Sequence, residues 1–492
     1  MNVYDQLRHP VALTIFILTL FFPVLVGFLT MRRTRNQSDF FIGGRTMNKL
    51  VVALSAVSSG RSSWLVLALS GMAYKIGVAA VWAVVGYVLA ELFQFVYIGR
   101  KLRVETESYQ SITLLDYFES RFQDRDHLIR ITGALIIGIF VTAYVAAQLK
   151  AGADSLSTAT GLPAVAALIL SSVLILIYMT LGGFIAVSYN DVIRAMIMLF
   201  GLVVFPAVGL IKVGGLFSLL QILKALNPAH INPVSIGAGA LIGFLGIGLG
   251  SPGQPHIIVR YMSIEHPDQL RKSALIGTFW NVLMGWGAVM IGLLGRAAIP
   301  QIEQLPEHNE EMIYLVLSGD YFGPVIYGLL VGGIFAAILS TADSQLLIVA
   351  STFVRDIYEK IIRRNQPIPE QKKLLLSRLI VIFSGCIALI LAYLARDIIF
   401  WLVLFAWGGL GAAFGPALIL SLYWKKTTRL GILSGMITGT VITILWKLYL
   451  KAPTGIYELI PAFFGACGMI LLISWIQDRQ SGNMKVQANT LC

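Results

Sequence analysis

Four polar side chains interrupt an apolar stretch between residues 331 and 347, VGGIFAAILSTADSQLL. They are Ser340, Thr341, Asp343 and Ser344. Their hydroxyl and carboxylate oxygens are hard ligands that suit a small hard cation. In a helix, positions three, four and seven apart share a face, which brings Ala337 together with three of them. Polar groups inside a membrane-length segment are costly unless they face an ion or a partner. The stretch predicts a cation site; the alternative, helix packing through the hydroxyls, leaves Asp343 unexplained.

The composition of the whole chain places this stretch in a membrane. Hydrophobic residues make up 57% of the 492 and charged residues only 13%, and apolar runs of about twenty residues recur. The net charge of +12 comes from basic residues in short segments between those runs. This is the positive-inside pattern of a membrane protein and not a nucleic-acid surface. We predict an all-α polytopic membrane protein that meets the lipid bilayer and no nucleic acid.

The sequence lacks the motifs of enzymes. The cysteines, Cys386, Cys467 and Cys492, have no metal-ligand spacing, and the six histidines form no H-E-x-x-H pair. There is no catalytic-triad or P-loop spacing either. The Gly-rich run GIGLGSPGQP has no β-α-β context, which argues against a phosphate-binding loop. We therefore expect neither an enzyme activity nor a cofactor.

Loop charges predict the topology. Residues 11–31 are apolar and are followed, not preceded, by Arg32, Arg33 and Arg35, which indicates a retained first span and not a signal peptide. Further basic clusters fall at alternate loops: Arg100–Arg103, Arg121–Arg130, Arg260–Lys272, Arg355–Lys373 and Lys425–Arg429. The loops between them are poor in Lys and Arg, and residues 303–311 are acidic. Placing the basic loops in the cytoplasm predicts about thirteen spans, with the N-terminus outside and the C-terminus cytoplasmic.

Two of the spans are interrupted. Residues 47–72 contain SSGRSS, and residues 235–258 contain several Gly and two Pro in GIGLGSPGQP. Irregular backbone at membrane depth survives only where it lines a cavity or is buried in protein. Two broken spans separated by four intact ones are typical of an inverted-repeat secondary transporter with its site at the breaks. The Gly-rich residues 401–416 indicate close helix packing.

Seven motifs, in their order along the chain, resemble the sodium/solute symporter family and most of all its sodium/proline branch. They are DFFIGGR (39–45), SSGRSSW (58–64), LLDYFESRF (114–122), GGFIAVSYND (182–191), GQPHIIVRY (253–261), AAILSTADSQLL (336–347) and AWGGLGAAFGP (406–416). The resemblance covers nearly the whole chain. It implies a five-plus-five inverted-repeat core with broken first and sixth core helices, and sodium-coupled import of a small organic solute by alternating access.

The resemblance also implies a location and a domain organisation. We expect a multi-pass protein of the bacterial cytoplasmic (inner) membrane. Residues 1–476 would form one transmembrane transport domain, and residues 477–492 a short cytoplasmic tail. This fold also occurs as the input domain of signalling kinases, but only a short polar tail follows residue 476, which disfavours a membrane sensor.

The resemblance assigns the sodium ligands. The main site would use the backbone carbonyls of Ser58, Arg61 and Ala337 with the hydroxyls of Ser340 and Thr341. A helix break frees carbonyls and a facing helix supplies hydroxyls, so the residue types agree.

A second group of residues has two interpretations. Asp191 matches an acidic residue that relatives place below the main site. With Ser340, Asp343 and Ser344 it would form a second sodium site or an exit path. The alternative is a charge at the cytoplasmic helix end, paired with Arg194.

The expected substrate pocket lies between the two breaks. Its residues are Gly60, Ser62, Ser63 and Trp64 from the first break, Tyr144 and Gln148 from the third core span, and Ile247 and Ser251 from the second break. Proline symporters carry Asp in place of Gly60 and aromatic residues in place of Ile247 and Ser251. These departures remove a carboxylate and two apolar walls. We expect proline or a related amino acid as the solute, followed by a carboxylate or sugar acid.

Arg61 lies in the first break, where a cation needs an anionic neighbour. The candidates are Asp343, Glu91 and the carboxylate of the solute, which a guanidinium can bind with two parallel hydrogen bonds. One interpretation is a permanent ion pair that locks the break. A shared role is the other, in which Arg61 turns to the substrate when it is bound. A third transporter hypothesis, sodium-independent exchange with Arg61 as the fixed cation, is disfavoured by Ser340, Thr341 and Asp191.

Overall fold

The structure is a computed structural model that describes residues 3–31, 37–179, 183–364, 366, 368–395 and 397–490. All regular elements in these ranges are helical, apart from one isolated β-bridge between Met47 and Ile264. The basic cluster Arg32, Arg33 and Arg35 lies outside the described residues, as does Cys492.

The helices begin and end as follows: α1 Pro10–Met31, α2 Gln37–Ile42, α3 Lys49–Ser63, α4 Leu69–Ile76, α5 Val81–Phe93, α6 Arg100–Ser108, α7 Leu114–Phe122, α8 Leu128–Thr160, α9 Ala164–Met179, α10 Phe184–Val213, α11 Leu216–Leu226, α12 Ala238–Gly246, α13 Pro255–Ser263, α14 Leu270–Ala298, α15 Ile313–Tyr321, α16 Pro324–Ser351, α17 Glu370–Leu394, α18 Ile399–Tyr423, α19 Arg429–Leu445, α20 Lys451–Thr454 and α21 Leu459–Thr490. Irregular helical turns connect several of them, notably η3 Trp64–Ala68, η5 Gln94–Gly99, η7 Ile247–Gly253 and η11 Glu310–Met312.

Among the described residues, nine helical segments are long and apolar enough to cross a membrane. One of them, Lys49–Ser108, has 60 residues and would be about 90 Å long if straight, three times the hydrocarbon thickness. The chain turns within it at Gly77, whose φ of 73° is accessible to glycine without strain. Shorter apolar helices lie at Pro10–Pro23, Ala164–Leu176, Leu216–Leu226 and Ala238–Gly253. The all-α polytopic class is thus confirmed, and the total of about thirteen spans stays a prediction.

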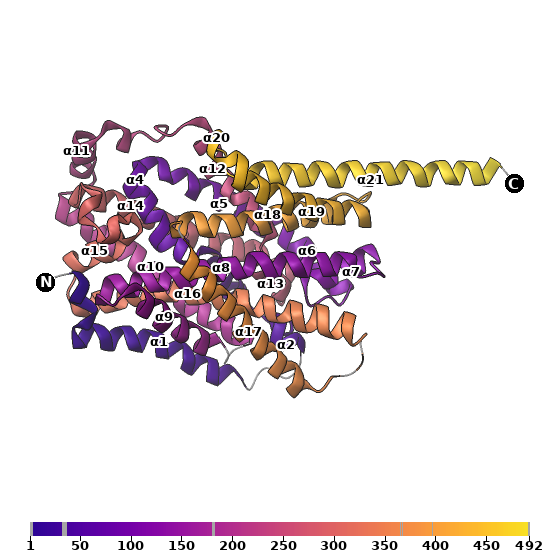
Figure 1. Cartoon of the computed structure of the whole chain (residues 1–492), viewed down its shortest axis with the longest axis horizontal. Coiled ribbons are helices and arrows are strands. Elements are labelled where there is room, and N and C mark those ends of the chain that lie inside the picture. Colours follow the sequence, from indigo (N-terminus) through magenta and orange to yellow (C-terminus); the bar gives the residue numbers. More distant parts are fainter. Residues whose placement is uncertain are drawn as a thin grey trace.

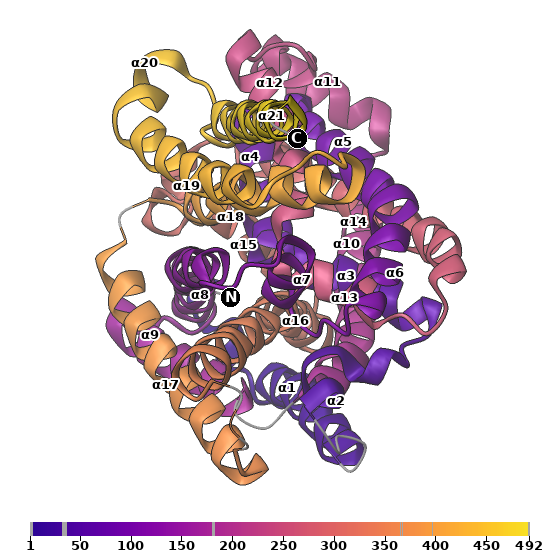
Figure 2. The same ribbon diagram turned by 90° about the vertical axis from the view of Figure 1, so that its right-hand side faces the viewer.

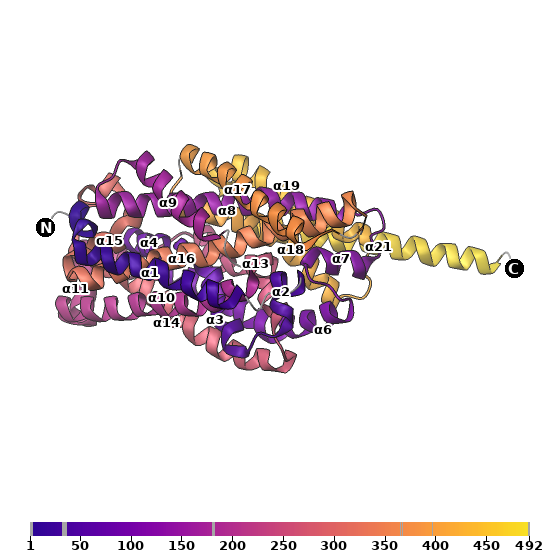
Figure 3. The same ribbon diagram turned by 90° about the horizontal axis from the view of Figure 1, so that it is seen from below.

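The long helices run roughly along one axis, and α21 extends past the bundle at its C-terminal end (Figures 1 and 3). Viewed along that axis, α3, α8, α13 and α16 occupy the middle, while α1, α17 and α19 lie at the periphery (Figure 2). In the apolar window of the segment that contains α16, 83% of residues are buried, against 29% in that of α17. The helix that carries the predicted cation ligands is therefore surrounded by protein, where polar side chains find partners.

Both predicted interruptions are present. Near the end of α3 the backbone leaves the helical conformation at Ser62, with φ 51° and ψ −170°, before η3 continues the path. A residue other than glycine in this region is strained and needs support from its surroundings. Between α12 and α13 the chain passes through η7 and then Gln254, which is extended with φ −93° and ψ 103°. Pro255 begins α13, where its missing N–H is tolerated.

The Gly-rich part of α18 packs directly on η7. A Cβ on Gly411 would lie 2.5 Å from the Cα of Gly250, and a Cβ on Gly253 would lie 2.5 Å from the Leu410 carbonyl oxygen. Trp407 of α18 donates from Nε1 to the Ile247 carbonyl at 2.8 Å. The prediction of close helix packing at residues 401–416 is confirmed.

A buried carboxyl group holds the N-terminal end of α18. Glu311 accepts hydrogen bonds from the backbone N–H groups of Ile399 (2.8 Å) and Phe400 (2.7 Å), which have no partner inside the helix. A Cβ on Gly71 of α4 would lie 2.8 Å from the Cα of Glu311, so this residue is also clamped against α4. Burial raises the pKa of the Glu311 carboxyl to about 8.

The raised pKa predicts a pH-dependent stability. The folded state holds a proton on Glu311 up to about pH 8, whereas a free Glu loses it near 4.5. This contribution to the free energy of unfolding is therefore complete below pH 4.5 and is lost as the pH rises through 8. We expect the thermal midpoint of the purified protein to fall across this range, and Glu311→Gln to flatten the slope. The exposed Glu307 of the same loop supplies the control Glu307→Gln. Equal slopes for wild type and Glu311→Gln would contradict the assignment.

Candidate functional site

The predicted cation ligands meet at the contact between α16 and the end of α3. The Ser340 hydroxyl is 3.2 Å from the Ser58 carbonyl oxygen and 3.0 Å from that of Ala337. The Thr341 hydroxyl donates at 3.0 Å to the carbonyl of Ser59, a residue that was not among the predicted ligands. These groups are fully buried. Two hydroxyl and three carbonyl oxygens, the ligands a small hard cation prefers, therefore converge in a site closed to solvent.

The break at Ser62 explains why carbonyls are available there. In a continuous helix the Ser63 N–H would donate to the Ser59 carbonyl. Here the Ser63 N–H donates to Gln148 Oε1 on α8, at 3.2 Å. The Ser59 carbonyl is left for Thr341. The carbonyl of Arg61, the remaining predicted ligand, is not free in this way, because it accepts a hydrogen bond from the Trp64 N–H.

The predicted substrate residues of α3 and α8 lie against each other. The Ser63 hydroxyl donates to Gln148 Oε1 at 3.0 Å, and the Tyr144 hydroxyl is 3.5 Å from the Ser62 hydroxyl. Within the described part of the chain, two buried donors here have no hydrogen-bond partner, Gln148 Nε2 and Trp64 Nε1. Buried donors of native proteins are nearly always paired. These two are therefore candidate donors for a ligand with acceptor oxygens.

The predicted substrate residues of the second break have other partners. The Ile247 carbonyl accepts from Trp407, and the Ser251 hydroxyl donates to Gln94 Oε1 of η5. Their hydrogen bonds thus go to α18 and η5. Gly60 is closely packed against α13 and α5, since a Cβ on it would lie 3.0 Å from Ile257 and 3.5 Å from Glu91 Oε1.

Arg61 has its anionic partner inside the protein. Its guanidinium pairs with Glu91 of α5, donates to Asn281 Oδ1 of α14 at 2.8 Å, and lies 3.9 Å from the ring centre of Tyr87. Asn281 also donates to Glu91. Of the two resident partners predicted, Glu91 is the one in contact. The arrangement matches the interpretation of an ion pair that locks the break.

The other predicted partner, Asp343, belongs to a second buried group. Its Oδ2 is 2.6 Å from Arg194 Nη1, and the same nitrogen is 3.5 Å from Asp191 Oδ1. Asp191 Oδ2 accepts from the hydroxyls of Ser55 (2.7 Å) and Ser59 (3.0 Å). The structure thus brings the predicted second set together, and it also contains the predicted pair of Asp191 with Arg194.

Comparisons with known proteins now place the chain. A family model described as "SSF: Sodium:solute symporter family" matches residues 40–439. The chain is 34% identical over 466 residues to the sodium/proline symporter of Escherichia coli (strain K12), covering 93% of this chain and 92% of the relative. It is also 34% identical over 473 residues to the high-affinity proline transporter PutP of Bacillus subtilis (strain 168), covering 95% and 98%. The chain belongs to the sodium:solute symporter family.

Solved structures agree on the fold. A sodium-coupled sialic acid symporter, described as substrate-bound and outward-open, aligns with a TM-score of 0.77 at 19% identity, covering 95% of this chain and 98% of that one. A nucleobase-cation-symport-1 family transporter in a closed conformation aligns with a TM-score of 0.54 at 13% identity, covering 90% and 96%. The protein is a multi-pass membrane protein and a sodium-coupled solute symporter, and not an enzyme.

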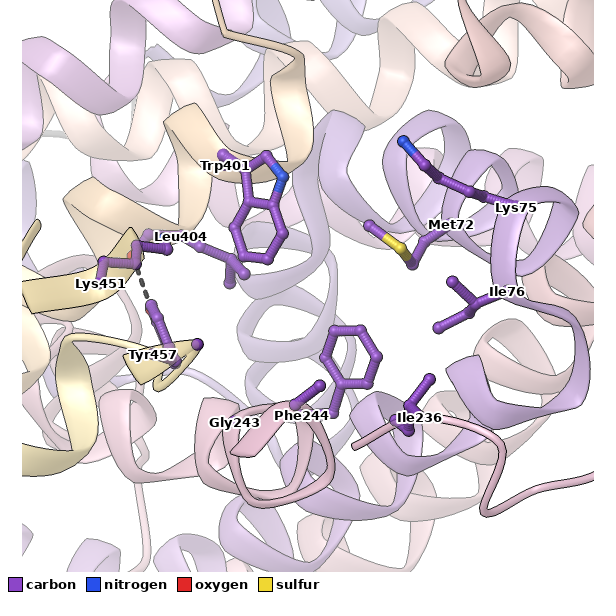
Figure 4. A pocket seen from close by; sticks show the side chains of 12 residues that line it. Met72, Lys75, Ile76, Ile236, Gly243, Phe244, Trp401, Leu404, Lys451 and Tyr457 are labelled. Atoms are coloured by element: carbon purple, nitrogen blue, oxygen red, sulfur yellow. Dashed lines mark hydrogen bonds between the residues drawn. The ribbon is translucent and has the colours of Figure 1, made fainter. Parts of the chain in front are cut away.

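A cavity of about 260 Å³ opens between α4, α12, α18 and α20 of the symporter. Figure 4 shows Met72, Lys75 and Ile76 facing Trp401 and Leu404 across it. Its two lysines are paired: Lys75 with Glu310, and Lys451 with Glu458, each at 2.9 Å. The rest of the lining is largely apolar and aromatic.

Aromatic rings connect this cavity to the α3 break. Phe244 in the cavity wall is 6.1 Å from the ring of Phe400, which in turn is 5.8 Å from that of Trp64. The cavity therefore lies on the far side of an aromatic layer from the candidate substrate residues.

Sequence reasoning missed His256 of α13 as a candidate substrate residue. Its ring is fully buried, lies 6.1 Å from the ring of Tyr144, and has no hydrogen-bond partner on either nitrogen among the described residues. The available signal was its position two residues after Gln254, in a polar motif that follows the second break.

The Arg61–Glu91 pair generates a double-mutant prediction. Arg61→Met removes the cation and leaves Glu91 buried without its partner, so we expect a loss of about 3–5 kcal/mol in the free energy of unfolding. Adding Glu91→Gln removes the orphaned charge and should recover most of that loss. Thermal unfolding of the detergent-solubilised variants measures both. A stable Arg61→Met protein with weakened solute binding would instead place Arg61 in the substrate site.

Proposed function

We propose that this symporter imports proline or a related amino acid together with sodium, by alternating access through a five-plus-five inverted-repeat core. The contact of the Ser340 and Thr341 hydroxyls with the carbonyls of Ser58 and Ser59 carries the proposal. Sodium would insert between these groups, with the Ala337 and Arg61 carbonyls as its further ligands.

Sodium and solute would act on the same turn of α3. The Ser59 carbonyl faces α16, whereas the N–H and hydroxyl of Ser63 face Gln148 of α8. A cation that orders the Ser59 peptide therefore also fixes the groups that meet the solute. An inward sodium ion supplies about 2.3 kcal/mol per 100 mV of membrane potential.

Two buried hydrogen-bond donors without a partner, next to the break in α3, support a solute with a carboxylate. Gln148 Nε2 and Trp64 Nε1 are both buried beside Ser62 and Ser63 and would donate to its oxygens. Proline is the substrate named for the relatives described above. A carboxylate or sugar acid is the second candidate, because Gly60, Ile247 and Ser251 do not provide the carboxylate and aromatic walls of proline symporters.

We further propose the orientation that follows from the loop charges. The N-terminus lies outside the bacterial cytoplasmic membrane, and the C-terminus lies in the cytoplasm. The cavity beside Lys75 and Lys451 then faces outwards and is the entry route for the solute. Residues 477–490 continue α21 as a helix and would lie on the cytoplasmic side.

Removing the two hydroxyls tests the sodium site. Ser340→Ala with Thr341→Ala keeps good helix formers in α16. We expect the apparent affinity for sodium in proline uptake to fall at least about tenfold, equivalent to about 1.4 kcal/mol. The matched control is Ser351→Ala, because the Ser351 hydroxyl donates within α16 to the Ile348 carbonyl. Unchanged sodium activation in the double variant would remove the site from this position.

A solute screen tests the substrate class. The melting temperature of the purified symporter should rise with proline or another small carboxylate in sodium buffer, and much less in potassium buffer, because bound ligand stabilises the folded state. Gln148→Leu should abolish the shift caused by the carboxylate. It also removes the acceptor of the Ser63 N–H and hydroxyl and so lowers the unliganded midpoint, and each shift is therefore measured from the variant's own unliganded midpoint. A shift produced by neutral sugars and by no carboxylate would contradict the proposed class.

A further inference from the structure

Two arginines and two aspartates form a buried cluster next to the proposed sodium site. Arg194 and Asp191 come from α10, Arg260 from α13 and Asp343 from α16. All four side chains are almost completely buried. The cluster adjoins the main site through Ser59, whose carbonyl accepts from Thr341 and whose hydroxyl donates to Asp191.

Guanidinium groups already contact the oxygens that a second cation would need. Arg194 Nη1 lies between the carboxylates, 2.6 Å from Asp343 Oδ2 and 3.5 Å from Asp191 Oδ1. Arg260 Nη2 is 3.3 Å from Asp191 Oδ2 and donates to the Ser344 hydroxyl. The Ser344 and Ser59 hydroxyls are 3.1 Å apart. Each carboxylate and the Ser344 hydroxyl therefore face a permanent cation.

The charges of the cluster cancel, with two positive and two negative groups. A sodium ion added among them would give a buried excess of positive charge beside two guanidiniums, which is unfavourable in a low-dielectric interior. Guanidinium groups stay charged at all relevant pH values and hold two acceptors at once.

We propose that Arg194, supported by Arg260, is a resident cation that takes the place of a second sodium ion, so that this symporter binds one sodium ion per chain. This inference rests on the proposed sodium site at Ser340 and Thr341. Asp191, Asp343 and Ser344 then serve to bind the arginines, and they order the cytoplasmic halves of α10, α13 and α16 without a bound ion.

The number of sodium ions bound per chain tests this proposal, and it can be measured without knowing the solute. Equilibrium binding of radioactive sodium to the purified full-length protein should saturate at one ion per chain, with a Hill coefficient of one. Arg194→Gln leaves the cluster with one excess negative charge among hydroxyl oxygens. We expect it to bind a second sodium ion, with the Hill coefficient rising towards two. Arg194→Gln with Asp343→Asn is neutral again and should return to one ion.

Each outcome separates the hypotheses. Two ions in the wild type overturn the inference, and so does a single ion in a folded Arg194→Gln protein. A merely structural role for Arg194 would produce loss of binding and no gain of a site. The neutral double variant keeps the test valid if Arg194→Gln alone fails to fold, because two ions in it would show that the arginine charge does not set the count. Ser340→Ala with Thr341→Ala tests the proposed function separately: if one ion is still bound, the sodium lies elsewhere although the count of one stands.

Discussion

Backbone polar groups inside a membrane must find partners within the protein, and the break at Ser62 is where this constraint governs the structure. The break deprives the Ser59 carbonyl and the Ser63 N–H of each other. A hydroxyl from α16 satisfies the first and an amide from α8 the second. Both replacements are exchangeable: a cation can stand in for a hydroxyl at a carbonyl, and a solute oxygen can stand in for an amide at an N–H. The same two contacts that hold three helices together are thus the places where we propose that an ion and a solute bind.

Buried charged side chains, like buried backbone groups, need partners inside the protein, because a buried ion is stable only beside opposite charges. Arg61 is balanced by Glu91, and the Arg194–Arg260 group by two aspartates. A third group joins Arg130 and Arg355 to the carboxylates of Asp116, Glu119 and Asp356. Every one of these cations is an arginine, whose planar fork contacts several acceptors in fixed directions, which a lysine does not. The helices are therefore held in register by directional ion pairs as well as by apolar packing.

Features that depend on neighbouring residues in the sequence could be predicted, whereas contacts between different helices could not. The breaks were predictable because Gly, Pro and polar residues stand out within apolar runs, and the hydroxyl face of α16 was predictable from helical periodicity. Partners across helices were not, because they depend on how helices cross. Glu91 and Asp343 were equal candidates for Arg61 in the sequence, and only the positions of α5 and α10 send Asp343 to Arg194. For the same reason Ile247 and Ser251 contact Trp407 and Gln94, and His256 next to Tyr144 was overlooked.

The contact of η7 with α18 has a mechanical consequence. At Gly250, Gly253 and Gly411 the two segments meet backbone to backbone. Apart from the Trp407 ring, which packs on Gly250, the nearest contacts of Gly250, Gly253 and Gly411 between the two segments are with backbone atoms, and such contacts resist separation more than sliding. Small displacements of packed elements along each other are the shear motions by which domains rearrange without unpacking their core. The second break can then move along α18 by such a shear motion. Two hydrogen bonds, from Trp407 to the Ile247 carbonyl and from Gln254 to the Trp407 carbonyl, hold the second break at its present position along α18.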